Sequence, residues 1–238
     1  MNKSQPNAIA YVETTDIHVL SNVFAITNSL LDESLPSPNT QESHDALESM
    51  DWFQKGLFAY RGKRFDNAIH YFNEAYALQP HNAQCQYYLG NCFYRKKDYT
   101  SSVHHYEKAI SLKSNHTEAM NNLGVTYDAD SRFNQAIESF NKSIEINPNY
   151  ANAWYNLGNT HVHNRELDKA IVSYQSCLKL DAYHGRALYA LGNTFQNIGQ
   201  YENAIYAYNE VVKLYPNHYR AFMKKGLAHY KNGNYNDA

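Results

Sequence analysis

Asparagine side chains recur along the chain, and two pairs of them, Asn122 with Asn156 and Asn159 with Asn193, are 34 residues apart. A carboxamide both donates and accepts, so it can pair with the N–H and the C=O of an extended peptide while demanding little of the peptide's sequence. Neighbouring tyrosine rings add rigid apolar area and a polar tip. These side chains predict a peptide-binding groove, whose candidates are Asn91, Asn122, Asn156, Asn159, Asn193, Tyr155 and Tyr189.

The asparagines fall on one face of the predicted helices although asparagine is a poor helix former. The strongest candidates form a ladder of Asn122, Asn156, Asn159 and Asn193. The alternative is that asparagine is simply frequent in this chain. It also occurs at places predicted to be exposed, such as Asn67, Asn203 and Asn234.

Several cations, Arg186, Arg220, Lys224 and Lys231, are expected along the same face toward the C-terminal end. They could favour an acidic segment of a bound peptide. The plainer alternative is a solvated charged face, which we favour on the sequence alone.

Catalytic motifs are absent from the sequence. It contains no glycine-rich phosphate loop, no His-Glu-x-x-His helix and no Gly-x-Ser-x-Gly elbow. Twelve histidines raise the question of a metal site, but His161 and His163 are two residues apart and point to different helix faces. We therefore expect no enzyme activity, no metal and no cofactor.

Composition narrows the class of partner. The formal net charge of −2 argues against nucleic acid, because phosphate binding needs many cations. No apolar run approaches the roughly 18 residues that span a bilayer, so membrane insertion is not expected. Cys85, Cys92 and Cys177 form neither a Cys-x-x-Cys pair nor an even set, which favours buried thiols in a reducing, cytoplasmic compartment. The expected partner is a protein or peptide, with assembly into a larger complex.

Residues 1–48 differ from the rest of the chain, because they hold Lys3 against seven carboxylates. Residues 16–33 predict an amphipathic helix within this acidic segment, and the prolines of 35–40 predict a linker. The helix could cap the first repeat or compete for the groove. We favour the cap, because the end of a repeat array needs covering.

Glycine recurs six times at intervals of 34 residues, without insertion or deletion, which divides residues 49–238 into repeats. The predicted units are 49–82, 83–116, 117–150, 151–184, 185–218 and a truncated 219–238. Apolar spacing within each unit predicts two helices. Polar side chains such as Asp66 and Asn134 are expected to cap the second helix, with an aromatic just before the cap as a hydrophobic staple. The six glycines are Gly56, Gly90, Gly124, Gly158, Gly192 and Gly226.

Within the repeat, the sequence of Trp, Leu-Gly, aromatic, Ala, aromatic and Pro resembles the tetratricopeptide repeat family. Trp154, Leu157, Gly158, Ala170 and Pro148 illustrate it, while Gln86 and Ser102 depart from it. The resemblance implies an all-α fold, a right-handed superhelical solenoid of helix-turn-helix repeats, whose first helices line a concave groove for peptides or proteins.

The same resemblance implies two functions that differ in class. One is a non-catalytic protein-interaction scaffold. The alternative is the substrate-recruiting arm of a longer enzyme, such as a protein O-N-acetylglucosaminyl-transferase, since the asparagine ladder is similar to the one in that group. The chain stops just inside the second helix of the sixth repeat, which suggests a fragment of a longer protein. Some family members bind a C-terminal carboxylate through a set of Lys, Arg and Asn residues. This sequence does not contain the complete set.

Overall fold

The computed structural model describes residues 40–234. Contacts divide the chain into two units, residues 1–45 and 46–238. The repeats belong to the second unit, and the structure describes only residues 40–45 of the first. The amphipathic helix expected over 16–33 lies outside the described residues.

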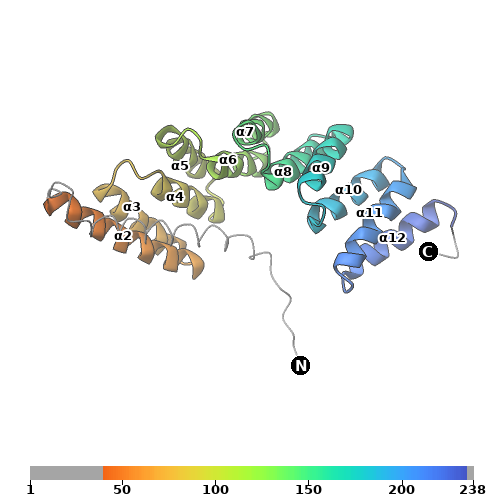
Figure 1. Ribbon diagram of the computed structural model, residues 1–238, viewed down its shortest axis with the longest axis horizontal. Helices are drawn as coiled ribbons and strands as arrows, with labels where there is room; N and C mark the ends of the chain where they lie inside the picture. Colours follow the sequence, from red (N-terminus) through yellow and green to blue (C-terminus); the bar gives the residue numbers. More distant parts are fainter. Residues whose placement is uncertain (1–39, 235–238) are drawn as a thin grey trace, which may run out of the picture. The chain divides into compact units, whose positions relative to one another are not determined.

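Within the described residues all regular structure is helical, which confirms the all-α fold class and the helix-turn-helix repeat (Figure 1). Successive helices pack on one another in pairs along the chain. The first helices of the repeats are α2 (Thr40–Arg61), α4 (Ala83–Arg95), α6 (Thr117–Ala129), α8 (Ala151–His163), α10 (Gly185–Asn197) and α12 (Tyr219–Lys231). The second helices are α3 (Phe65–Leu78), α5 (Tyr99–Leu112), α7 (Phe133–Ile146), α9 (Leu167–Leu180) and α11 (Tyr201–Leu214).

The glycine spacing reflects close packing inside each repeat. A Cβ atom built on Gly124 would lie 2.7 Å from the ring of Phe140, and one on Gly158 would lie 2.5 Å from the ring of Tyr174. Both rings are buried in the core. The second helix therefore places an aromatic ring directly over a glycine of the first helix, and this contact offsets the cost of about 1 kcal/mol for glycine inside a helix.

The second helices begin two residues earlier than the sequence analysis predicted. Asp66 and Asn134 lie inside α3 and α7 rather than at their caps, and the aromatic expected before the cap is the first residue of the helix. The turn between the helices contains a residue in the left-handed region, such as Lys97 with φ of 62°, which reverses the chain so that the helix begins immediately after it. In α5 the cap is Asp98, whose Oδ1 accepts from the backbone N–H of Ser101 at 3.1 Å.

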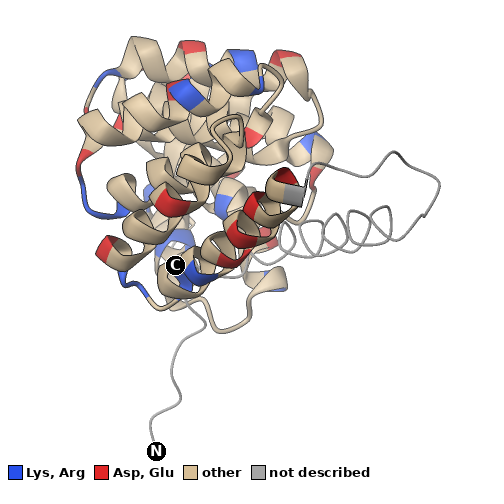
Figure 2. Ribbon diagram, turned by 90° about the vertical axis from the view of Figure 1, so that its left-hand side faces the viewer, with Lys and Arg blue, Asp and Glu red and all other residues tan. Residues whose placement is uncertain are grey.

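α2 also differs from the predicted division of the chain. The first repeat was predicted to start at residue 49, whereas α2 begins at Thr40 and runs unbroken to Arg61. Residues 40–48, assigned to the acidic segment, are therefore helical. Figure 2 shows the acidic residues that recur along α2, which are Glu42, Asp45, Glu48 and Asp51.

Candidate peptide-binding groove

The predicted groove residues lie on the first helices of the repeats, at places that recur from helix to helix. Tyr155 on α8 corresponds to Tyr189 on α10 and to Met223 on α12. Asn159 on α8 corresponds in the same way to Asn193 on α10. Because consecutive first helices contact one another, these places form continuous rows across α8, α10 and α12.

Three of the predicted asparagines bind a tyrosine of their own repeat. Tyr106 donates its hydroxyl to Oδ1 of Asn91 at 2.6 Å, and Tyr174 donates to Oδ1 of Asn159 at 2.8 Å. The third pair is Tyr208 with Asn193, at 2.9 Å, and the same hydroxyl lies 2.8 Å from Oε1 of Gln196. Burial raises the pKa of Tyr174 and Tyr208 above the usual range, so both hydroxyls keep the proton that they donate.

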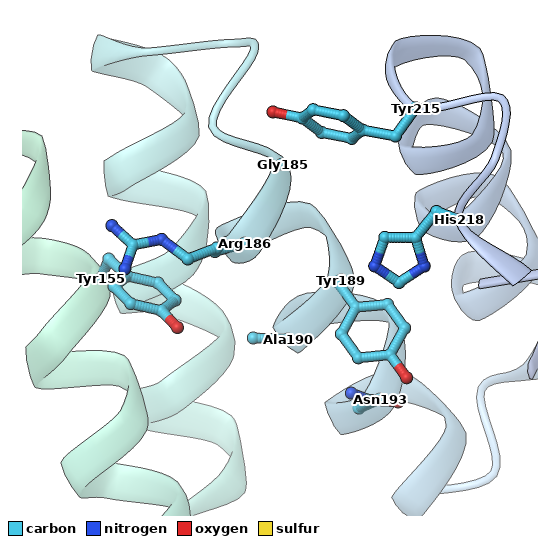
Figure 3. A pocket seen from close by; sticks show the side chains of 8 residues that line it. All are labelled: Tyr155, Gly185, Arg186, Tyr189, Ala190, Asn193, Tyr215 and His218. Atoms are coloured by element: carbon cyan, nitrogen blue, oxygen red, sulfur yellow. The ribbon is translucent and has the colours of Figure 1, made fainter. Parts of the chain in front are cut away.

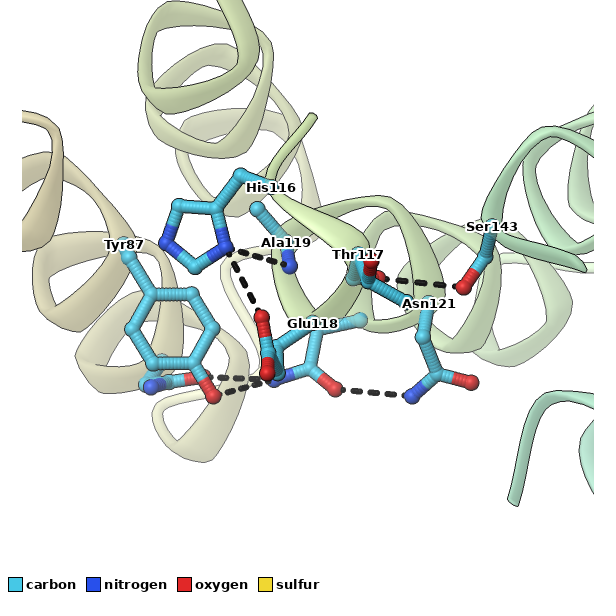
Figure 4. A network of polar contacts seen from close by, with 9 residues as sticks. Tyr87, His116, Thr117, Glu118, Ala119, Asn121 and Ser143 are labelled. Carbon is cyan, nitrogen blue, oxygen red and sulfur yellow. Dashed lines mark hydrogen bonds and ion pairs between the residues drawn. The ribbon is translucent and has the colours of Figure 1, made fainter. Parts of the chain in front are cut away.

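The asparagines of the N-terminal half of the groove bind one another. Nδ2 of Asn156 on α8 donates to Oδ1 of Asn121 on α6 at 3.0 Å. Nδ2 of Asn121 donates in turn to Oδ1 of Asn122 at 3.1 Å. Nδ2 of Asn122 lies within hydrogen-bond distance of Oδ1 of Asn91 and of the hydroxyl of Tyr87, at 3.0 and 3.2 Å. Part of this network, around Tyr87, His116 and Asn121, is drawn in Figure 4.

The two halves of the predicted ladder therefore differ in what they can offer a ligand. Asn122 donates from Nδ2 to Asn91 and Tyr87, and Asn156 donates from Nδ2 to Asn121. Asn159 and Asn193 use only their oxygen, and their Nδ2 groups have no partner among the described residues. Free amide donors thus remain on α8 and α10.

A pocket of about 420 Å³ opens beside one of these donors (Figure 3). It brings together four predicted residues, Tyr155, Arg186, Tyr189 and Asn193. Its other lining residues were not predicted from the sequence, and these are Gly185, Ala190, Tyr215 and His218. Of the remaining predicted residues, Arg220 and Lys224 lie on α12, and neither lines the pocket.

Two small residues create the pocket. Ala190 stands where α6 and α8 have Asn122 and Asn156, so the space of a side chain is left open. A Cβ atom on Gly185 would lie 2.2 Å from the ring of Tyr215, so the glycine allows this ring to close one wall of the pocket. Comparing the same place in successive repeats could have found Ala190, but no sequence signal gives the position of the Tyr215 ring.

Histidines at the repeat junctions cap the first helices, a role that the sequence analysis did not assign. Nδ1 of His184 accepts from the backbone N–H of Ala187 at 3.1 Å, and its Nε2 lies 3.3 Å from Oδ1 of Asn152. Both contacts are satisfied by a neutral ring with the proton on Nε2. Burial, and then the charge of Arg186, lower the pKa of His184, which favours this neutral form.

His218 repeats this arrangement at the pocket. Its Nδ1 accepts from the backbone N–H of Ala221 at 3.1 Å, so the proton of the neutral ring lies on Nε2. The Nε2 atom has no hydrogen-bond partner among the described residues. The rings of His218 and Tyr189 lie 5.2 Å apart between centroids, and His184 contacts Tyr155 in the same way at 5.0 Å.

Two of the predicted groove cations, Arg186 and Arg220, lie near tyrosine rings. The guanidinium of Arg186 lies 5.1 Å from the ring centroid of Tyr155, which also lines the pocket. Arg220 on α12 lies 5.8 Å from the ring of Tyr219, and its Nε donates to the hydroxyl of that residue at 3.1 Å. Cation–π contacts of this kind attract the guanidinium to the face of the ring.

In residues 40–234 the side chains offer no group of three or more His, Cys, Asp and Glu that could hold a metal ion. The three cysteines are free and buried. Among the described helices none is long and apolar enough to cross a membrane.

Helix pairs stacked in sequence, with a row of half-buried polar and aromatic side chains on the first helices, define the class of helical repeat proteins. Family models of the tetratricopeptide repeat match residues 151–184 and 185–218 and, separately, residues 53–117. A third model, also a TPR repeat, matches residues 129–164. Together the matches span more than half of the chain, which therefore belongs to the tetratricopeptide repeat family.

Solved structures share this fold. PilF from Pseudomonas aeruginosa superposes with a TM-score of 0.72 at 15% identity, covering 82% of this chain and 89% of PilF. YrrB, described as a TPR protein with an unusual peptide-binding site, has a TM-score of 0.60 at 19% identity, covering 79% of this chain and 93% of YrrB. A MamA structure has a TM-score of 0.59 at 29% identity, with coverage of 63% and 87%. Among curated protein sequences no match was found.

Proposed function

We propose that the chain is a non-catalytic interaction scaffold that binds an extended segment of a partner protein in the groove of α8, α10 and α12. The observation that carries this proposal is the pocket beside Tyr155 and Tyr189, which combines aromatic walls with an amide donor of Asn193 that no described residue uses. The tetratricopeptide fold, which mediates protein–protein interactions, supports it. YrrB, a structural neighbour, has a peptide-binding site.

The groove is expected to bind at its C-terminal half rather than along its whole length. Asn91, Asn121, Asn122 and Asn156 hydrogen-bond one another across α4, α6 and α8, so a peptide that used these groups would have to break existing hydrogen bonds. Exchanging one hydrogen bond for another gains little free energy. On α8 and α10 the donors of Asn159 and Asn193 need no such exchange.

Ala190→Asn tests this proposal. It introduces the residue that the two preceding repeats carry at the same place, so the helix should tolerate it while the pocket is filled. The matched control is Val172→Asn on α9, which changes an exposed apolar residue in the same way away from the groove.

Affinity capture from an extract of the cells that express the protein, read by quantitative mass spectrometry, should show partners that bind the wild type and the control but not Ala190→Asn. Circular dichroism should show equal helix content in all three proteins. Partners retained equally by all three would contradict a binding site in this groove.

The alternative, a substrate-recruiting arm of a longer enzyme, draws support from the two Nδ2 groups of Asn159 and Asn193, which could hold the backbone carbonyls of a substrate. Sequencing the complete gene distinguishes the two functions. A catalytic domain after residue 238 would favour the recruiting arm, and further repeats would favour the scaffold.

We also propose that the protein works in a reducing, cytoplasmic compartment. Its three cysteines are buried and unpaired, and burial raises the pKa of each thiol to about 12. Thiols of this kind act as small hydrophobic side chains and do not form disulfides in the folded protein. Fluorescence imaging of the tagged protein in its own cells tests this placement.

A further inference from the structure

The three helices of the C-terminal groove carry no carboxylate. None of α8, α10 and α12 contains Asp or Glu, whereas the preceding first helix, α6, contains Glu118 and Asp128. The same three helices hold five Lys and Arg residues, and three of these, Arg186, Arg220 and Lys224, stand at groove places. The charges on these three helices therefore favour an anionic ligand.

The pocket on α10 offers hydrogen-bond donors from each of its non-tyrosine polar groups. Asn193 offers Nδ2, because its Oδ1 accepts from Tyr208. His218 offers Nε2–H, because its Nδ1 accepts from the backbone of Ala221. Arg186 adds a guanidinium, a group that carries only N–H donors and no acceptor atom. A ligand group that only accepts, such as a carboxylate, satisfies these donors, whereas an amine or guanidinium does not.

The walls of the pocket also suit an acidic side chain rather than a bare anion. The rings of Tyr155, Tyr189 and Tyr215 line the pocket, and the small side chain of Ala190 leaves room for a ligand between them (Figure 3). The methylene groups of Asp or Glu can lie against these rings while the carboxylate reaches the donors.

One repeat further on, α12 presents a different surface at the same places. Met223 replaces Tyr189, and Leu227 replaces Asn193. Their side chains are 70% and 42% exposed, so an apolar patch follows the pocket along the groove. Arg220 and Lys224, which stand at the places of Arg186 and Ala190, lie beside this patch.

The distance between the pocket on α10 and the apolar patch on α12 determines how far apart the two ligand side chains that occupy them must be. Packed helices lie about 8–10 Å apart, and a polyproline II segment advances about 3.1 Å per residue with about three residues per turn. Side chains three residues apart in such a segment point the same way and lie about 9 Å from each other. A β-strand would instead place them on opposite sides.

We infer that the groove binds an extended, polyproline II-like protein segment in which Asp or Glu enters the pocket and an apolar side chain three residues away lies on Met223 and Leu227. This inference rests on the proposed function, because it specifies the ligand of the same groove. It replaces the solvated charged face favoured on the sequence alone.

A phage library of random 12-residue peptides, selected on the full chain, provides the first test. Selection on the wild type should enrich peptides with an acidic residue and a Leu, Ile, Met or Phe three positions away. Selection on Ala190→Asn should no longer enrich these peptides, while selection on Val172→Asn should enrich them as the wild type does. Leu227→Asn should keep the acidic preference and lose the apolar one.

The failures of the inference and of the proposed function are distinguishable in this selection. Peptides that depend on Ala190 but carry no acidic residue would overturn the inference and leave groove binding in place. Enrichment that Ala190→Asn does not affect, or no enrichment over the starting library, would overturn both.

A second test uses a synthetic, amidated copy of the most enriched peptide in fluorescence polarisation. Arg186→Ala should weaken its binding about 10-fold, the range of one charge-assisted hydrogen bond. Lys179→Ala, at an exposed cation on α9, should change it less than about 2-fold. If the acidic residue of the peptide is replaced by its amide, Arg186→Ala should have little further effect, and an undiminished 10-fold effect would overturn the pairing.

Discussion

The hydroxyl of Tyr174 donates a hydrogen bond of 2.8 Å to Oδ1 of Asn159, fifteen residues earlier in the same repeat. The pair recurs in two other repeats, as Tyr106 with Asn91 and Tyr208 with Asn193. Where the aromatic residue is instead a phenylalanine, as at Phe140, the earlier place holds the apolar Val125. The groove asparagines therefore have a structural role as partners of buried tyrosines, besides any contact with a ligand.

Asn159→Ala is expected to lower the free energy of unfolding by about 1–3 kcal/mol, because it leaves the buried Tyr174 hydroxyl without an acceptor. The double variant Asn159→Val, Tyr174→Phe should recover most of this loss, since it copies the pair of Val125 and Phe140. Urea unfolding followed by circular dichroism checks both. Asn141→Ala, at an exposed place on α7, is the control and should change stability by less than about 0.5 kcal/mol. A double variant no more stable than Asn159→Ala would contradict the pairing.

Gly124→Ala is expected to destabilise the protein by about 1–3 kcal/mol, because the new methyl group would lie 2.7 Å from the ring of Phe140. Helix propensity alone predicts the opposite sign, a gain of about 1 kcal/mol. The midpoint of urea unfolding decides between the two. A gain in stability would show that the glycine is not needed for the packing of the two helices.

Stability is expected to fall as the pH is lowered from 7 to 5. Burial, with the nearby His104 and Lys108, lowers the pKa of His105 to about 4, from about 6.5 in the unfolded chain. Between these values the unfolded state binds more protons than the folded state, so acid favours unfolding. The loss from His105 is about 1 kcal/mol at pH 5, once its partial exposure is taken into account.

His105→Gln should reduce that dependence, because glutamine can still contact Gln86 but does not titrate. Urea midpoints at pH 7, 6 and 5 measure it for both proteins. An equally steep loss of stability in the variant would assign the pH dependence to other groups.

The cysteines are expected to react with a thiol reagent such as 5,5′-dithiobis(2-nitrobenzoate) only after unfolding. Cys85, Cys92 and Cys177 are fully buried, and burial raises the pKa of each thiol to about 12, so neither access nor the reactive thiolate is present at pH 8. Reaction in guanidinium chloride should release three equivalents. Rapid reaction of any thiol in the native protein would contradict the packing of α4 or α9.

Much of the fold could be predicted from the sequence, because the 34-residue glycine spacing reports one contact that every repeat needs. The start of the second helices could not be placed correctly, because residues such as Lys97 adopt a left-handed backbone conformation. The identity of a lysine side chain does not predict this conformation. The role of Asn159 was also open from the sequence, because a carboxamide suits a peptide backbone and a tyrosine hydroxyl equally well. The pocket depends on the ring of Tyr215 and on the small Ala190, features that only packing reveals.

Site-specific photocrosslinking tests the central claim, that partners bind in the groove of α8, α10 and α12, most directly. The photoreactive amino acid p-benzoylphenylalanine replaces Tyr189 in the groove and, in a second protein, Tyr206, which is 69% exposed on α11. We expect a partner protein to crosslink from position 189, to be lost when Ala190→Asn is added, and not to crosslink from position 206. Crosslinking from position 206 alone would contradict the account and place recognition on the second helices.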